Sequence, residues 1–257
     1  MVKIIFSDFD NTMMNYYSDK NYFNDYQISI LKKVKERGIK FCLVTGRSIS
    51  FFEQFSNLLG VVDYIIGSNG AVVYDVKNRE FIYHKNIKKE VLKNLIDYAV
   101  KNNYSFILNC LDKRYQYGEW KYVSGEKFDS HEEYDSEQMI LSFKKINGDN
   151  ISNFMQYLDH IIVNNTTDWG DEFSIDITDS SVSKGNTVLW LCSNLEIDRE
   201  DAIAFGDGNN DLSMFEVVGK SVAVDNAQDN IKNMADEVTL KCSEDGIYKY
   251  IEKNILK

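Results

Sequence analysis

Proline is absent from this chain of 257 residues, and histidine occurs only three times. About 13 prolines would be usual at this length, since proline makes up ~5% of average sequences. Its absence removes the slow isomerisation of X-Pro peptide bonds from folding. His84, His131 and His160 are not paired with a serine or cysteine motif, which argues against a histidine-based nucleophilic site.

The chain also has few cysteines and no long apolar run. Its four cysteines are scattered and form no C-x-x-C pair, so zinc-ligand spacing is missing and a reducing compartment is expected. No apolar run approaches the ~18 residues that cross a bilayer. Asp8 falls where the apolar segment of a secretory leader would continue. We therefore expect a cytoplasmic protein that does not contact a membrane.

Acidic residues outnumber basic ones by 40 to 29, which gives a net charge of −11. Such a surface repels nucleic acid and anionic membranes on average, so neither is expected as a partner. A local phosphate site remains compatible with this charge, because a metal ion and one or two basic side chains can reverse its sign locally. The sequence leaves the oligomeric state open, and a monomer is compatible with it.

Apolar strands and amphipathic helices alternate at both ends of the chain. Strands are predicted at Lys3–Asp8, Lys40–Val44, Tyr64–Gly67, Ala202–Gly206 and Ser221–Ala223, and a hairpin over residues 71–84. Helices are predicted at Asp25–Arg37, from Ser48 onward, and at Lys184–Leu195, Asn210–Val217, Ala227–Ala235 and Asp245–Lys253. This alternation predicts an α/β fold, a doubly wound Rossmann-like core around a parallel sheet.

The middle of the chain has a different pattern, rich in strands. A helix is predicted at Lys88–Asn102, strands at Tyr104–Cys110, Tyr115–Val123, Met139–Ile146, His160–Asn165 and Glu172–Thr178, and a second helix at Asn150–Leu158. This pattern indicates an inserted α+β domain. We therefore expect a core domain of residues 1–84 and 181–257, interrupted by a cap domain of residues 85–180.

Acidic residues follow two of the predicted core strands at the point where each strand ends. Asp8 and Asp10 follow the first strand, and Asp207 and Asp211 follow the strand Ala202–Gly206. Ligands of parallel sheets bind at the carboxyl ends of the strands, so these side chains are expected to meet. Clustered carboxylates and a substrate phosphate are ligands that suit Mg²⁺. Asp and Asn also begin ordinary turns, but two such clusters at strand ends favour a site.

Two further motifs could bind an anion. The first is Thr45-Gly46-Arg47, which lies where a strand ends and a helix begins. The Thr45 hydroxyl, the close backbone approach that Gly46 allows and the amides at the helix start are all suited to bind a phosphate. Lys184 precedes Gly185 at the start of another helix, where a positive charge opposes the helix dipole and is a reasonable anion ligand. Taken singly, the tripeptide is compatible with an ordinary turn, and the lysine with a surface side chain.

A dinucleotide site is not indicated at the second acidic cluster. Gly206-Asp207-Gly208 begins like a G-x-G-x-x-G motif, but Asp211 stands where the third glycine is required. Two acids in this loop would also repel a pyrophosphate unless a metal intervened.

Taken together and in order, these motifs resemble those of the haloacid-dehalogenase-like hydrolase superfamily. The motifs are Asp8-Phe9-Asp10-Asn11-Thr12, Thr45-Gly46-Arg47, Lys184-Gly185 and Gly206-Asp207-Gly208-Asn209-Asn210-Asp211. More narrowly, the chain resembles the Cof-like sugar-phosphatase branch, with an α/β cap between the second and third motifs. Ser68-Asn69-Gly70-Ala71 also matches that branch, and the resemblance covers nearly the whole chain.

The resemblance implies roles for the acidic residues. Asp8 would be the nucleophile that forms an aspartyl-phosphate, and Asp10 the acid that protonates the leaving oxygen and then activates water. Mg²⁺ would be held by Asp8, the backbone carbonyl of Asp10, and Asp207. Asp211 would ligate through water or orient the other ligands. Asn11 stands where the family usually has glycine, and Asn tolerates unusual backbone angles better than most residues.

The resemblance also implies how the substrate is held. Thr45, the Gly46 amide, Lys184 and Asn210 would bind the phosphoryl oxygens, with Arg47 beside them as a further substrate-binding residue. The inserted domain would be a lid that excludes water and contacts the rest of the substrate. Candidates for lining this lid are Arg114, Tyr117, Trp120 and Trp169, each of which could equally pack within the lid itself.

The function predicted first is a Mg²⁺-dependent phosphatase acting on a small phosphorylated metabolite, such as a sugar phosphate. A phosphotransferase or phosphomutase would use the same aspartyl-phosphate chemistry and is the first alternative. A non-catalytic phospho-accepting signalling module is the second alternative. Such a module is about half this length and has no use for a cap.

Overall fold

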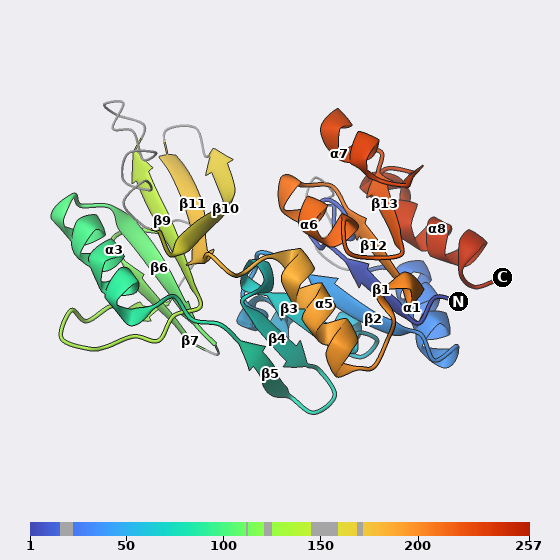
Figure 1. Cartoon of the computed structure of the whole chain (residues 1–257), viewed down its shortest axis with the longest axis horizontal. Helices are drawn as coiled ribbons and strands as arrows, with labels where there is room; N and C mark the ends of the chain where they lie inside the picture. Colours follow the sequence, from blue (N-terminus) through green and yellow to red (C-terminus); the bar gives the residue numbers. More distant parts are fainter. Residues whose placement is uncertain (16–22, 112, 121–124, 145–158, 169–171) are drawn as a thin grey trace.

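The computed structural model describes residues 1–15, 23–111, 113–120, 125–144, 159–168 and 172–257 (Figure 1). Its strands form two sheets, one of eight strands and one of six, which lie side by side. The predicted helix Asn150–Leu158 lies outside the described residues. Within the described part of the chain, no helix has both the length and the apolar character needed to cross a membrane.

The eight-stranded sheet has the order β14-β13-β12-β1-β2-β3-β4-β5. Its strands are β1 (Ile4–Ser7), β2 (Lys40–Val44), β3 (Tyr64–Gly67), β4 (Val72–Asp75), β5 (Glu80–His84), β12 (Ala202–Gly206), β13 (Lys220–Val224) and β14 (Glu237–Thr239). The strands from β14 to β3 are parallel, and β4 and β5 join as an antiparallel hairpin. The central strands are short apolar runs because both faces of a parallel sheet are covered.

Helices cover both faces of this sheet, as predicted for a doubly wound fold. They are α1 (Asp25–Glu36), α5 (Lys184–Asn194), α6 (Leu212–Phe215), α7 (Asp229–Met234) and α8 (Gly246–Asn254). Helix α1 packs against α8, and α5 packs against α6 on the opposite face (Figure 1). Helix α1 begins with a capping box, in which Asn24 and Gln27 bond each other's backbone amides.

The helix predicted from Ser48 onward is different in the structure. A 3₁₀ helix, Ile49–Gln54, is followed by the single turn α2 (Ser56–Leu59). The Ser48 hydroxyl makes no cap hydrogen bond but contacts Ser50 and Arg114. Aromatic packing is the physical reason for the broken helix, because the rings of Phe51, Phe52 and Phe55 all lie within 6 Å of the Phe9 ring centre.

The six-stranded sheet has the order β10-β11-β9-β6-β7-β8 and lies in the chain between β5 and α5. Its elements are α3 (Lys89–Lys101), β6 (Ser105–Cys110), β7 (Lys113–Tyr117), β8 (Glu126–Lys127), β9 (Gln138–Lys144), β10 (Ile161–Asp168) and β11 (Glu172–Asp179). All pairs are antiparallel except β7 with β8. The sheet has a hydrophobic cluster of its own, so the α+β insert is an independently packed layer.

Two details of the predicted strands need correction. Strand β7 (Lys113–Tyr117) stops before Gly118, whose left-handed φ of 78° breaks the extended run, and residues 121–123 of the predicted strand lie outside the described residues. Strands β8 and β14 were not predicted, since two or three residues at a sheet edge carry too short a pattern to recognise.

Helix α5 approaches α6 so closely that Gly185 is required at the contact. A Cβ at this position would overlap the backbone carbonyl of Ser213. We expect Gly185→Ala to lower the free energy of unfolding by about 1–3 kcal/mol, because backbone must move to relieve the overlap. Urea unfolding followed by circular dichroism measures this change.

Gly60→Ala is the matched control for this stability measurement. Gly60 has a φ of −70°, and an added Cβ would meet only ordinary contacts, the nearest at 3.5 Å. Its stability change is expected to stay within about 0.5 kcal/mol. Equal losses in the two variants would contradict a specific clash between α5 and α6.

Candidate active site

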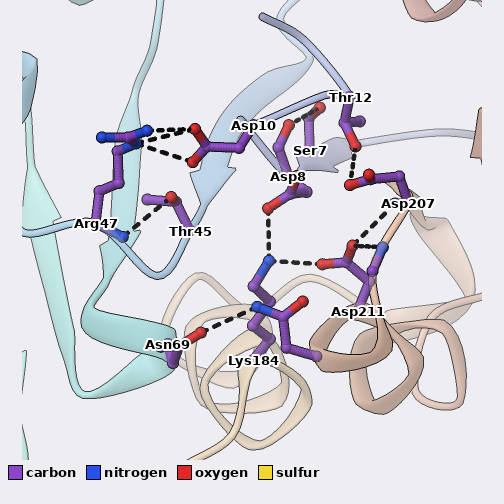
Figure 2. Close-up of polar contacts among 12 residues, drawn as sticks. Ser7, Asp8, Asp10, Thr12, Thr45, Arg47, Asn69, Lys184, Asp207 and Asp211 are labelled. Atoms are coloured by element: carbon purple, nitrogen blue, oxygen red, sulfur yellow. Dashed lines mark hydrogen bonds and ion pairs between the residues drawn. The ribbon is translucent and has the colours of Figure 1, made fainter. Parts of the chain in front are cut away.

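The candidate site lies where β1 and β12 end side by side. These strands are parallel neighbours, with Ser7 paired to Phe205. The Asp8 amide donates to the Phe205 carbonyl at 2.9 Å, which holds the two acidic loops together. The structure thus brings Asp8, Asp207 and Asp211 to one edge of the sheet, as the motif positions predicted (Figure 2).

The loop after β1 turns sharply at Asn11. This residue has a left-handed φ of 59°, which Asn tolerates better than most residues with a side chain. Its amide donates to the Met14 carbonyl at 2.8 Å, which closes the turn. The turn lets the Thr12 hydroxyl donate to Asp207 at 3.2 Å. Asn11 therefore adopts a conformation for which glycine is the usual choice.

Lys184 lies at the centre of the acidic cluster. Its Nζ is 2.6 Å from Oδ1 of Asp8 and 2.6 Å from Oδ1 of Asp211, and its side chain is fully buried. Burial lowers the pKa of Lys184, but the charges of Asp211 and Asp8 outweigh this effect and raise the pKa above its ordinary value. The lysine is therefore a fixed cation, and not the exposed side chain that was one interpretation of the sequence.

Burial dominates the electrostatics of the carboxylates as well. It raises the pKa of Asp8 well above its usual range, and Lys184 only partly offsets this. For Asp207, burial and the charge of Asp211 raise the pKa to about 6, against the hydrogen bond from Thr12. Crowded buried carboxylates bind protons when no cation is bound among them. The cluster is therefore suited to a metal ion.

Three carboxylates in this cluster have the geometry of a metal site. Ligand oxygens of Asp8, Asp207 and Asp211 all lie within 4.8 Å of one another. Oδ2 of Asp211 accepts hydrogen bonds from the amides of Asp207 and Gly208 at 2.9 Å each, which fixes its orientation. An all-oxygen donor set of this kind fits Mg²⁺.

The carboxylate of Asp10 lies outside this cluster and pairs with Arg47 (Figure 2). Nε of Arg47 is 3.0 and 2.9 Å from the two carboxylate oxygens, and a terminal nitrogen is 2.6 Å from Oδ1. The guanidinium also stacks 4.0 Å from the Phe51 ring centre. Arg47, predicted to bind substrate, is thus held against the predicted acid.

The other predicted phosphate ligands lie at the ends of β2 and β12. Thr45 is fully buried, and its hydroxyl accepts from the Arg47 amide at 3.2 Å. The Gly46 carbonyl accepts from Gln138 of the six-stranded sheet at 3.2 Å. The Asn210 side chain donates to Oδ1 of Asn69 at 3.0 Å.

The predicted lid residues differ in whether they contact the core or pack within the insert. Arg114 contacts the Ser48 hydroxyl of the core and Asn109 of its own sheet. Tyr117 stacks on Phe106, 5.2 Å between ring centres, and so packs within the insert itself. Trp120 is half-buried, and Trp169 lies outside the described residues.

Several polar residues for which the sequence predicts no role join the two sheets. The Ser68 hydroxyl donates to Glu137 at 3.4 Å, and the Asn69 amide donates to Asp176 at 3.3 Å. Burial raises the pKa of Glu137 above its usual value. The Ser68-Asn69 dipeptide was visible as a motif, whereas Glu137 and Asp176 carry no local signal.

Residues 5–251 match the family described as haloacid dehalogenase-like hydrolase. The chain belongs to this family. The recognition of the superfamily and of its Cof-like branch is therefore confirmed, and the hydrolase is an enzyme rather than the alternative signalling module. The predicted fold class is confirmed too, since a haloacid dehalogenase-like hydrolase from Bacillus subtilis superposes with a TM-score of 0.83 at 22% identity. That comparison covers 99% of this chain and 100% of the other.

Two relatives of the hydrolase carry phosphatase names. A protein of Buchnera aphidicola that has such a name is 28% identical, over 100% of both chains. A phosphoglycolate phosphatase of Methanobrevibacter smithii is 27% identical, over 88% of both chains. The lengths of the relatives thus match that of the hydrolase, and their names support the predicted phosphatase class.

A divalent cation should stabilise the folded hydrolase, and more so at higher pH. Since the pKa of Asp207 is about 6 in the folded state and 3.8 ordinarily, the metal-free fold loses stability as pH rises through 6. Mg²⁺ competes with those protons. At ~100-fold excess over its Kd, it should raise Tm by roughly 5 °C or more at about pH 7.5, and by less at about pH 5.5. Differential scanning fluorimetry measures both shifts.

The variants Asp207→Asn and Asp229→Asn test the location of this effect. Asp229 has a side chain that is 92% exposed, so its replacement should leave the Mg²⁺ shift unchanged. Replacement of Asp207 should remove most of the Mg²⁺-induced increase in Tm. A full shift in the Asp207 variant, or equal shifts at the two pH values, would contradict the proposed metal site.

Proposed function

We propose that this hydrolase is a Mg²⁺-dependent phosphatase of small phosphorylated metabolites that works through an aspartyl-phosphate on Asp8. The observation that carries the proposal is the buried ammonium group of Lys184, 2.6 Å from both Asp8 and Asp211. A carboxylate that attacks a phosphate dianion needs adjacent positive charge, which offsets repulsion and stabilises the transferring oxygens. The phosphatase names of the relatives support the same reaction class.

The acidic cluster would hold the Mg²⁺. Asp8, Asp207 and the backbone carbonyl of Asp10 would be ligands, and Asp211 would orient them, in keeping with its hydrogen bonds to the loop amides. When bound, the ion supplies positive charge near the phosphoryl oxygens. The closeness of the three carboxylate oxygens, within 4.8 Å, supports this assignment.

The proposed reaction has two displacement steps at phosphorus. In the first, a carboxylate oxygen of Asp8 bonds to phosphorus, the bond to the ester oxygen breaks, and Asp10 protonates the departing alcohol. In the second, water bonds to phosphorus, the bond to Asp8 breaks, and Asp10 takes a proton from the water. One ester and one water yield one alcohol and one phosphate, and both aspartates return to their starting states.

The ion pair between Arg47 and Asp10 bears on the first step. Arg47 holds both oxygens of the Asp10 carboxylate, whereas in the proposed first step Asp10 must give a proton to the departing alcohol. The phosphoryl group of the substrate would draw Arg47 away and release Asp10 for proton transfer. Thr45, the Gly46 amide and Asn210 would also bind the phosphoryl oxygens.

The six-stranded sheet would cover this site and select the rest of the substrate. Domain boundaries near residues 85 and 180 are supported by the separate hydrophobic clusters of the two sheets. Arg114, which contacts Ser48 of the core, is the lid residue that the structure best supports. The scattered cysteines, which form no C-x-x-C pair, are compatible with action in the cytoplasm. A sugar phosphate or a similar small phosphomonoester is the substrate class that we propose.

Asp8→Asn should abolish turnover while leaving the fold intact. The amide keeps the size of the side chain but cannot form the phospho-enzyme, so phosphate release should fall by roughly 10³-fold or more. The measurement is release of phosphate from a panel of sugar phosphates and aryl phosphates, with Mg²⁺ and with EDTA.

Asp97→Asn is the matched control, because Asp97 is an exposed aspartate on α3. It should retain full activity, and circular dichroism should show both variants folded. Substantial Mg²⁺-dependent release by purified Asp8→Asn protein would refute the mechanism. Absence of release from every ester by the unaltered protein would refute the proposed reaction.

A further inference from the structure

Asn69 lies in a strained turn between β3 and β4. Ser68, Asn69 and Gly70 have consecutive left-handed φ values of 49°, 58° and 109°. A non-glycine residue in this region costs of order 1–3 kcal/mol and is retained where the surroundings enforce it. Backbone hydrogen bonds do so here, since the amide of Asn69 donates to the Thr45 carbonyl and that of Ser68 to the Arg47 carbonyl, both at 2.9 Å.

The side-chain amide of Asn69 contacts three separate segments. Its Oδ1 accepts from Asn210 at 3.0 Å, and its Nδ2 donates to Asp176 of β11 at 3.3 Å. It also packs on Gly46 so closely that a Cβ there would lie 3.1 Å from either amide atom. The side chain is almost wholly buried. The Asn69 amide therefore links the insert to Asn210 and Gly46, two of the proposed phosphate ligands.

Other contacts from the insert converge on the same two segments of the core. Gln138 donates to the Gly46 carbonyl, Glu137 accepts from Ser68, and Arg114 reaches Ser48. Asp176 depends on Asn69 in particular. Burial raises the pKa of Asp176 to about 7, and the leading opposing influence is the hydrogen bond from Asn69.

We propose that Asn69 is a positioning residue through which contact with the six-stranded sheet orients Asn210 and Gly46 for phosphate binding. The proposal rests on the proposed phosphatase function and adds a role that the function does not require. When Asp176 holds Nδ2, the opposite face of the amide is fixed toward Asn210. Without that contact, the Asn69 amide rotates and the Asn210 donor loses its fixed partner. Closure of the insert over the site is thereby coupled to binding of the phosphoryl group.

Orthophosphate is the probe for this coupling, because it has no leaving group that the insert could contact. Asp176→Ala should weaken Mg²⁺-dependent orthophosphate binding by roughly 10-fold, the effect of losing one positioning hydrogen bond. Asp176→Asn keeps a hydrogen-bond acceptor for Asn69 and should stay within about threefold of the unaltered protein. Isothermal titration calorimetry measures these dissociation constants on the full chain.

Asn69→Gly tests the route of the effect. Glycine accepts a φ of 58° without strain, so this change removes the amide and keeps the turn. It should weaken orthophosphate binding by itself, and Asp176→Ala should then cause no further loss in the double variant. Asn69→Asp is a second variant of unchanged shape, which accepts from Asn210 but repels Asp176 and should also weaken binding.

Asp135→Ala is the control for removal of an acid from the insert, since its side chain is 63% exposed. It should leave orthophosphate binding unchanged. If Asp176→Ala has no effect, or an equal effect with and without Asn69, the positioning role is refuted while the phosphatase proposal stands. If the unaltered protein neither binds orthophosphate nor hydrolyses any ester, the phosphatase proposal itself fails, and the inference with it.

Discussion

The burial of Lys184 between Asp8 and Asp211 is the interaction on which the rest of the site depends. A buried ammonium group loses its hydration, and only close opposite charges compensate for that loss. Here two carboxylate oxygens at 2.6 Å do so. Removal of the lysine would leave the acids of the cluster without a fixed cation. The contact therefore allows carboxylates to crowd together at a sheet edge where they would otherwise repel.

This interaction joins parts of the chain that are far apart in sequence. Asp8 follows β1, Lys184 begins α5, and Asp211 ends the short turn after β12. The insert leaves the core after β5 and returns just before Lys184, so the connection between the two sheets lies close to the central cation. The hydroxyl of Thr187, one turn along α5, donates to the Gly70 carbonyl at 2.6 Å. Helix α5 is thus fastened to the same turn that carries Asn69.

The sequence predicted those parts of the fold and the site that a local pattern of residues marks. Apolar runs that end in acids predicted which strands meet, because parallel strands deliver their ends to one edge. Other features depend on tertiary packing and leave no periodic signal. The pairing of Asp10 with Arg47 and that of Asn69 with Asp176 join residues 37 and 107 positions apart. The rings around Phe9 likewise override the helix predicted after Ser48.

The charge of the site sets the order in which the proposed metal ion and substrate can bind. Three carboxylates and one ammonium group leave two negative charges when all are ionised, and the protein as a whole is acidic. A phosphate dianion that approached this cluster directly would be repelled. Protons reduce that charge at the cost of the proposed nucleophile, because a protonated Asp8 could not attack phosphorus. A divalent cation neutralises the cluster and leaves Asp8 ionised. In the proposed reaction, the acidic cluster and the anionic substrate are therefore compatible only when the cation binds first.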